Sequence, residues 1–259
     1  MSVRWAKMLG DPSAISNLRK EGFDCIQLPL YRLMDLNEDE FSKVKEDIRG
    51  EELFPEVCVS PLPPDAYVSQ RGFNMYVWTE FLKKAVRRAS ECGCKKIVWN
   101  DGRARVLPLE GDVGGIKEQV LQFLYLLCEF GDNFNISILV EPLGAKRTNF
   151  LNSMKEIDDF LHLVSKENIS SVISLRELPE IGLEIENLNA YARLISHVQI
   201  ENPTITVGDR RAPRREDKYD YGHFLNALQA MGYNGVITLP EDSDRESLNY
   251  IRGLWEKQV

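Results

Sequence analysis

A carboxylate stands at the end of a short apolar run in the middle of the chain. The run covers residues 136–140, Glu141 follows it directly, and Pro142 ends it. A continuous apolar run of this length is typical of a buried strand. A charge at the tip of such a strand is unfavourable unless it meets a partner, water or a metal ion. Glu141 is therefore the first candidate for chemistry.

An arginine in the loop after this strand is the second candidate. Arg147 cannot act as a base, because the pKa of its guanidinium lies above about 12. It can form a forked pair with a carboxylate or phosphate, or neutralise Glu141. We expect Arg147 to lie within reach of Glu141 and to compensate its charge. The alternatives are that Arg147 is an anion clamp for substrate, a solvated loop residue, or a salt partner of Glu177 or Glu201.

The elements that must position these residues alternate along the whole chain. The predicted strands are 3–8, 25–28, 56–59, 96–99, 137–140, 171–175, 196–200 and 236–239. The predicted helices are 12–21, 38–49, 77–92, 116–130, 153–164, 185–194, 221–231 and 245–257. Eight strand–helix repeats predict an α/β chain that folds as a single-domain (β/α)8 TIM barrel over residues 1–259. A doubly wound open sheet is the alternative, but no Gly-x-Gly-x-x-Gly follows the first strand.

Three long irregular segments follow strands. They cover residues 60–75, 100–115 and 201–219. In a parallel barrel all three lie at the carboxyl ends of the strands, and long loops gathered on one face are where binding sites form. The expected site is therefore the mouth of the barrel, where Glu141 also emerges.

Composition limits the class of partner. The net charge of −8 disfavours nonspecific binding to nucleic acid or to an anionic membrane. No apolar run approaches the ~20 residues that span a bilayer. Arg4 and Lys7 interrupt the first segment, so a secretory signal is not expected and a cytoplasmic location is. Five cysteines in apolar surroundings are expected to be free buried thiols.

Several segments, taken in order, match one known family. They are 100–108 (NDGRARVLP), 141–150 (EPLGAKRTNF), 197–203 (HVQIENP) and 210–213 (RRAP). In this order and spacing they resemble the sugar phosphate isomerase/epimerase family of xylose isomerase-like TIM barrels. The resemblance covers most of the chain in its strand–helix rhythm. It implies the same fold and chemistry on a small carbohydrate.

The resemblance also implies a divalent Mn or Mg ion, held by a Glu, an Asp, a His and a second Glu. Glu141 matches the first ligand, but Ser174, Gln199 and Pro240 occupy the other three positions. Arg147 stands in place of a catalytic glutamate. Hard divalent ions need several anionic or imidazole ligands, so we expect no bound metal or other cofactor. The alternative is a different oxygen-rich site, built from Glu141, Glu177, Glu201 and Glu241.

The resulting candidate residues fall into two groups. Glu141 and Glu177 are the candidate catalytic residues. The candidate substrate-binding residues are Trp99, Arg105, Arg147, Asn149, His197 and Arg210. Trp99 is at a strand tip, where an aromatic ring could stack on a sugar. His197 is more typical of a hydrogen-bonded core residue than of a base.

These residues are compatible with two functions and argue against a third. The family resemblance implies an isomerase or epimerase of a small carbohydrate, with the metal site mostly lost. The lost ligands favour a catalytically silent barrel that binds a sugar or sugar acid, or that stabilises an active paralogue. A second copy of the same chain, forming a homo-oligomer, is the alternative to a paralogue as the protein partner. A nuclease of the abasic-site type would need a histidine-rich metal site and a basic surface, and the sequence has neither.

Overall fold

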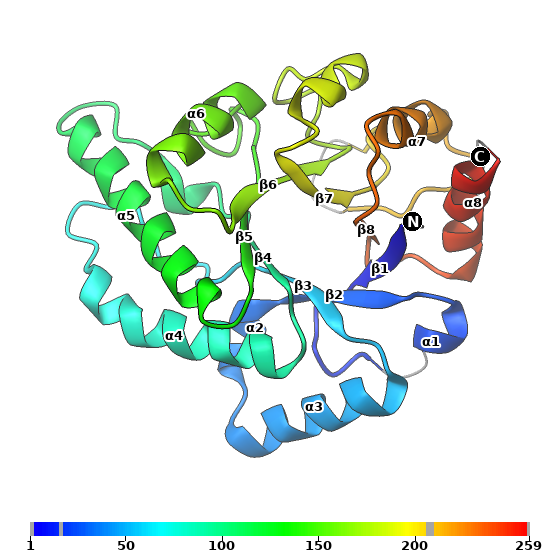
Figure 1. Cartoon of the computed structure of the whole chain (residues 1–259), viewed down its shortest axis with the longest axis horizontal. Helices are drawn as coiled ribbons and strands as arrows, with labels where there is room; N and C mark the ends of the chain where they lie inside the picture. The colour runs from blue at the N-terminus through cyan, green and yellow to red at the C-terminus, as the bar shows by residue number, and fades with distance from the viewer. Residues whose placement is uncertain (1–2, 16–17, 206–209, 258–259) are drawn as a thin grey trace.

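Eight parallel strands close into a barrel in the computed structural model, and helices surround it (Figure 1). The structure describes residues 3–15, 18–205 and 210–257. The strands are β1 Arg4–Met8, β2 Cys25–Pro29, β3 Pro55–Val59, β4 Lys96–Trp99, β5 Ser137–Val140, β6 Ile169–Ser174, β7 Ile195–Gln199 and β8 Val236–Leu239. Pairing of β1 with β8, with Ala6 opposite Thr238, closes the sheet. The predicted (β/α)8 TIM barrel is confirmed.

The helices start sharply because polar caps precede them. They are α1 Leu18–Glu21, α2 Leu30–Asp35, α3 Glu38–Glu51, α4 Met75–Glu91, α5 Val113–Asp132, α6 Met154–Val164, α7 Tyr221–Ala230 and α8 Arg245–Glu256. Asp112, Ser153, Asp220 and Asp244 each accept a hydrogen bond from a backbone N–H in the first turn of the helix they precede. Each such cap contributes about 1 kcal/mol. Among the described helices none is long and apolar enough to cross a membrane.

Three helical segments differ from the sequence-based prediction. Residues 12–15 form turns and only α1 is helical there, while 16 and 17 lie outside the described residues. The short α2 was missed, and the buried Arg88 of α4 anchors it by donating to the backbone oxygens of Leu33 and Leu36. The predicted helix 185–194 is the 3-10 segment η2 Ile185–Tyr191, in which two asparagines favour turns over a regular helix.

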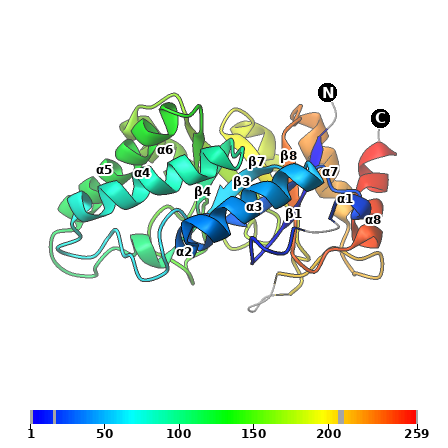
Figure 2. The same ribbon diagram turned by 90° about the horizontal axis from the view of Figure 1, so that it is seen from below.

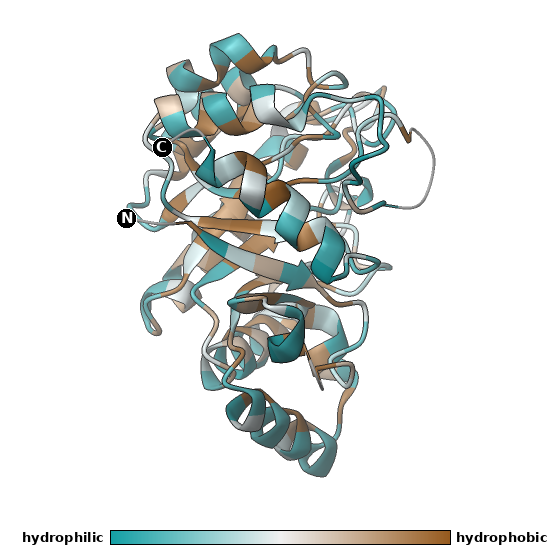
Figure 3. Cartoon of the chain, turned by 90° about the vertical axis from the view of Figure 1, so that its right-hand side faces the viewer, coloured by the Kyte–Doolittle hydropathy of each residue, from teal (hydrophilic) through white to brown (hydrophobic). Residues whose placement is uncertain are grey.

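The core divides into an outer layer and a barrel interior. Apolar faces of the helices pack on the outward side chains of the strands, and hydrophilic residues cover the outer surface (Figure 3). Five side chains fill much of the interior: Val57, Val59, Val98, Leu139 and Val172. Because strand side chains alternate, Leu139 inside the barrel places Glu141 inside as well. The same alternation places His197, Gln199 and Glu201 inside.

The loops that follow the strands gather at one end of the barrel (Figure 2). The backbone N–H of Ser69 in the loop after β3 donates to the carbonyl of Ala104 in the loop after β4. Asn149, after β5, accepts from the N–H of Leu107 at 2.7 Å and donates to its carbonyl at 2.9 Å. These bonds tie successive loops into one rim around the mouth.

Candidate active site

The tips of three neighbouring strands bring polar side chains together at the mouth. Ser174 and Gln199 end β6 and β7, and Glu141 directly follows β5. Glu201 lies two residues beyond β7 and is buried with them. Pro240 directly follows β8, at the same end. The four positions that the resemblance aligns with metal ligands therefore share one end of the barrel, as the sequence predicted.

Glu141 is the most unusual group in this cluster. Its side chain has no exposed surface, and among the described residues neither carboxylate oxygen finds a hydrogen-bond donor. The nearest cation is Arg210, whose Nη2 lies 3.8 Å from Oε1. Burial raises the pKa of Glu141 to about 7, although Arg210 and Arg147 favour its charged form. The carboxyl group therefore gains and loses a proton near neutral pH.

Arg210 lies at the centre of the cluster. Its Nη1 donates to Oε1 of Gln199 and lies 3.1 Å from Oε1 of Glu201. Burial disfavours its charge, but Glu201, Glu141 and Glu177 outweigh this effect, so the pKa of Arg210 is raised. The guanidinium therefore stays protonated and spans the tips of β5 and β7. Its side chain is 20% exposed, whereas that of Glu141 is fully buried.

Glu201 is held from the opposite side by a hydroxyl. The Oγ of Ser174 lies 2.9 Å from Oε1 and 3.1 Å from Oε2 of Glu201, so it donates to this carboxylate. The Nε2 of Gln199 has no acceptor among the described residues. Glu141 and Gln199 thus both keep unused hydrogen-bonding capacity inside the barrel.

Arg147 binds a different glutamate from the one predicted. Its Nη1 lies 2.8 Å from Oε1 of Glu177, in the turn after β6, and the N–H of Gly144 approaches Oε2 at 3.4 Å. The predicted pairing of Arg147 with Glu141 is wrong, because Arg210 is the cation nearest to Glu141. Arg147 acts on Glu141 only at longer range, where its charge lowers the pKa of that carboxyl.

Arg105 and Trp99 lie behind the strand tips, outside the cluster. The Nη2 of Arg105 donates to the backbone oxygen of Glu141, and its guanidinium lies over the Trp99 ring at 5.4 Å. The ring of Trp99 packs on Phe123 of α5 at 5.0 Å. Burial lowers the pKa of Arg105 to about 10. Both side chains are fully buried and fix the end of β5, and their predicted contact with substrate stays a prediction.

Two other predicted binding residues have structural partners. Both side-chain atoms of Asn149 bind the backbone of Leu107 in the rim. The Nε2 of His197 lies 3.0 Å from Oε1 of Gln27 and 3.3 Å from Oγ1 of Thr238, below the cluster. Burial lowers the pKa of His197 to about 3, so its ring is neutral. This placement agrees with the sequence-based expectation that His197 is a hydrogen-bonded core residue rather than a base.

The sequence did not single out Gln27, and it offered Glu241 only as part of an alternative metal site. Gln27 is fully buried in β2, and its Nε2 has no acceptor among the described residues. A polar residue between Ile26 and Leu28 in a short apolar strand was the signal that could have found it. Glu241 is exposed and turned toward Gly10, where a Cβ would lie 2.8 Å from its Oε2. It does not join the cluster.

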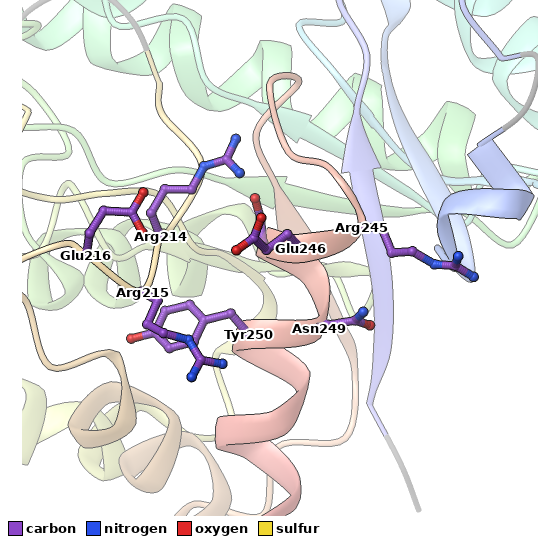
Figure 4. Close-up of a pocket in the computed structure, with 8 residues that line it drawn as sticks. Arg214, Arg215, Glu216, Arg245, Glu246, Asn249 and Tyr250 are labelled. Atoms are coloured by element: carbon purple, nitrogen blue, oxygen red, sulfur yellow. The ribbon is translucent and has the colours of Figure 1, made fainter.

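A separate hollow of about 390 Å³ lies between the loop after β7 and the start of α8 (Figure 4). Arg214, Arg215, Arg245 and Tyr250 line it. Arg214 is bound to Asp244 at 2.7 Å, and Arg245 extends away from the other two arginines in Figure 4. The three guanidinium groups do not converge on one point, so this hollow is not the better candidate site.

The sequence model of one family, described as xylose isomerase-like TIM barrel, matches residues 15–254. The chain belongs to this family. No curated protein is similar enough to match the chain.

Several solved structures share the fold of this chain. The chain superposes on D-psicose 3-epimerase, solved in the presence of D-fructose, with a TM-score of 0.80, 13% identity and coverage of 98% of this chain and 99% of that one. For 3-keto-D-glucoside 4-epimerase from E. coli the TM-score is 0.78 and the identity 16%, with coverage of 97% of this chain and 100% of that one. For AP endonuclease, family 2, from Brucella melitensis the TM-score is 0.76 and the identity 16%, with coverage of 97% of this chain and 98% of that one. At this identity the likeness shows the fold alone.

The donor set of this xylose isomerase-like barrel does not fit a four-ligand divalent ion. Pro240 offers no side-chain donor, Oε1 of Gln199 already accepts from Arg210, and the Ser174 hydroxyl donates to Glu201. Among the described residues no three His, Cys, Asp or Glu side chains are grouped to hold a metal ion. A guanidinium lies where carboxylate and amide oxygens meet, and an arginine is always positively charged.

Proposed function

We propose that the protein is a sugar isomerase or epimerase that acts on a small carbohydrate without a protein-bound divalent ion. The observation that supports it best is Glu141: a buried carboxyl with unused oxygens, a pKa of about 7 and a guanidinium 3.8 Å away. General acid–base catalysis is most efficient when the pKa of the catalytic group lies near the working pH. A buried carboxyl that served only to pack the barrel would have no use for a pKa near the working pH.

The proposed chemistry moves a proton on the carbon next to a carbonyl group. The ionised carboxylate of Glu141 takes this proton, and the electron pair of the C–H bond forms an enediolate whose charge lies on oxygen. Arg210 donates to that oxygen, since preorganised donors stabilise charge that develops in the transition state. In an isomerisation the protonated Glu141 then delivers the proton to the former carbonyl carbon, while the hydroxyl proton of the enediolate passes to the charged oxygen and leaves the new carbonyl group behind. Glu177, held by Arg147 at the rim, is the second carboxylate proposed to take part.

The charge balance of the rim supports an uncharged substrate. Arg147 is paired with Glu177, Arg210 with Glu201, and Arg211 with Asp242 at 3.8 Å. A sugar acid or sugar phosphate would have to replace one of these carboxylates. A neutral sugar needs only hydrogen bonds and is therefore the better fit, with a sugar acid as the second choice.

The full burial of Glu141 favours one other function. A sugar contacts this carboxyl only if neighbouring side chains, such as that of Arg210, shift, because Glu141 has no exposed surface. If Arg210 stays in place, the barrel is catalytically silent and binds a sugar at the rim, forms a homo-oligomer, or stabilises an active paralogue. The net charge of −8 continues to disfavour a nuclease.

Deuterium exchange separates the two functions. Ketohexoses, ketopentoses and aldoses are incubated with the protein in D2O, and NMR measures exchange at the carbon next to the carbonyl. The matched variant is Glu141→Gln, which keeps the shape of the side chain but cannot accept the proton. We expect exchange with at least one sugar and a loss of about 100-fold or more in Glu141→Gln. Binding of a sugar without any exchange would favour the silent barrel.

A further inference from the structure

The cluster at the mouth already contains a cation that belongs to the chain. The guanidinium of Arg210 contacts Gln199 and Glu201 from β7 and approaches Glu141 from β5. These three side chains present oxygen atoms to it from two strands. Oxygen atoms converging on one point from separate strands are also what a hard divalent ion requires.

We propose that Arg210 is the resident cation of this site and that it excludes divalent metal ions from Glu141 and Glu201. The proposal deepens the proposed function and rests on it only for the role of the site, because the charge argument holds for a silent barrel as well. A guanidinium carried by the chain itself would supply the positive charge next to the substrate oxygen. It would also make the site independent of the supply of metal ions.

The unused oxygens of Glu141 are the independent sign that this is a cation site. Glu141 is fully buried, has no donor among the described residues, and faces the guanidinium. Without Arg210, two buried carboxylates, the amide oxygen of Gln199 and the hydroxyl of Ser174 would share one small space. Such a set is anionic and offers only oxygen to an ion, and water can complete the coordination of Mn²⁺ or Mg²⁺.

The test removes the guanidinium and offers a metal ion in its place. The variant Arg210→Met keeps much of the side-chain volume without the charge, and Arg210→Lys is the matched control that keeps a cation. Each protein is freed of metal and titrated with MnCl2. Thermal unfolding reports stabilisation, and electron paramagnetic resonance counts bound Mn²⁺.

We expect Arg210→Met to bind about one equivalent of Mn²⁺ and to rise in melting temperature by about 3 °C or more at tenfold excess over its Kd. The wild-type protein and Arg210→Lys should show neither effect. The double variant Arg210→Met with Glu141→Gln should lose most of the binding. Stoichiometric Mn²⁺ in the wild-type protein would overturn the proposal.

If Arg210→Met does not fold without an added cation, the proposal can still be tested. The proposal then requires that MnCl2 or a few millimolar guanidinium chloride restores a folded protein, and no rescue by either cation would refute it. The metal result is also separate from the activity result. Mn²⁺ bound to an active wild-type protein contradicts the resident cation and the metal independence of the proposed function but leaves the isomerase or epimerase activity standing. A metal-excluding barrel without proton exchange contradicts only the proposed activity.

Discussion

Replacing Glu141 by glutamine should make the protein more stable at alkaline pH. The pKa of this carboxyl is raised from 4.5 to about 7 by burial. Between these two values the folded protein binds more protons than the unfolded chain, so the free energy of unfolding falls as the pH rises. Below pH 4.5 the carboxyl contributes no penalty, and above pH 7 the penalty is complete.

The size of the effect follows from the shift. One pKa unit corresponds to 1.36 kcal/mol, so a shift of about 2.5 units destabilises the fold by about 3 kcal/mol at pH 8. Glu141→Gln removes this penalty and keeps the side-chain shape. We expect the variant to unfold about 6 °C or more above the wild-type protein at pH 8, and close to it at pH 5.

Urea unfolding followed by circular dichroism between pH 5 and 8 measures this difference. Glu177→Gln is the control, because it removes a carboxylate that Arg147 binds at 2.8 Å and should lower stability at pH 8. A Glu141→Gln protein that is less stable than wild type at pH 8 would refute the reasoning. So would a difference between the two proteins that does not change with pH.

Three further predictions concern the groups around Glu141. Arg105→Ala should lower the free energy of unfolding, measured by urea denaturation, by about 3 kcal/mol or more, because it empties a buried site behind the strand tip. The control Arg103→Ala removes an exposed side chain and should change this free energy by less than about 0.5 kcal/mol. A double-mutant cycle of Arg147→Ala with Glu177→Gln should give a coupling of about 0.5–1 kcal/mol, while Arg147→Ala and Glu141→Gln should be nearly additive. Gly102→Ala should destabilise the fold by about 1–3 kcal/mol, since its Cβ would lie 2.7 Å from the backbone oxygen of Arg147. In contrast, Gly50→Ala in α3 meets no atom within 4 Å and should be neutral or slightly stabilising, and thermal unfolding compares the two.

The strand tips could be predicted from the sequence because their pattern is local. An apolar run that ends in Glu141 and Pro142 marks both a strand and its exit, and eight such repeats determine a barrel. The direction of Trp99 was harder to infer, because the residues before it are apolar on both faces of the strand. Only its pairing with Val140 across β4 and β5 shows that it faces α5.

The ion pairs at the mouth could not be predicted, because they depend on loop conformation. Arg147 and Arg210 both lie in irregular segments, and neither position has a periodic pattern that indicates its direction. Arg147 follows Glu141 closely in sequence, but the turn after β6 brings Glu177 to it first. The loop after β7 returns Arg210 to the strand tips, which leaves it nearest to Glu141.

Because Arg105 contacts both Glu141 and Trp99, the fluorescence of Trp99 should report on changes at the mouth of the barrel. The guanidinium binds the backbone oxygen of Glu141 on one side and covers the indole ring on the other. Indole emission responds to nearby charge, so a sugar that displaces Arg210 or protonates Glu141 should alter the fluorescence of Trp99. Comparison of the wild-type protein with Trp99→Phe isolates this signal from the other three tryptophans. Ligands of the mouth can therefore be screened by emission alone, before any reaction has been identified.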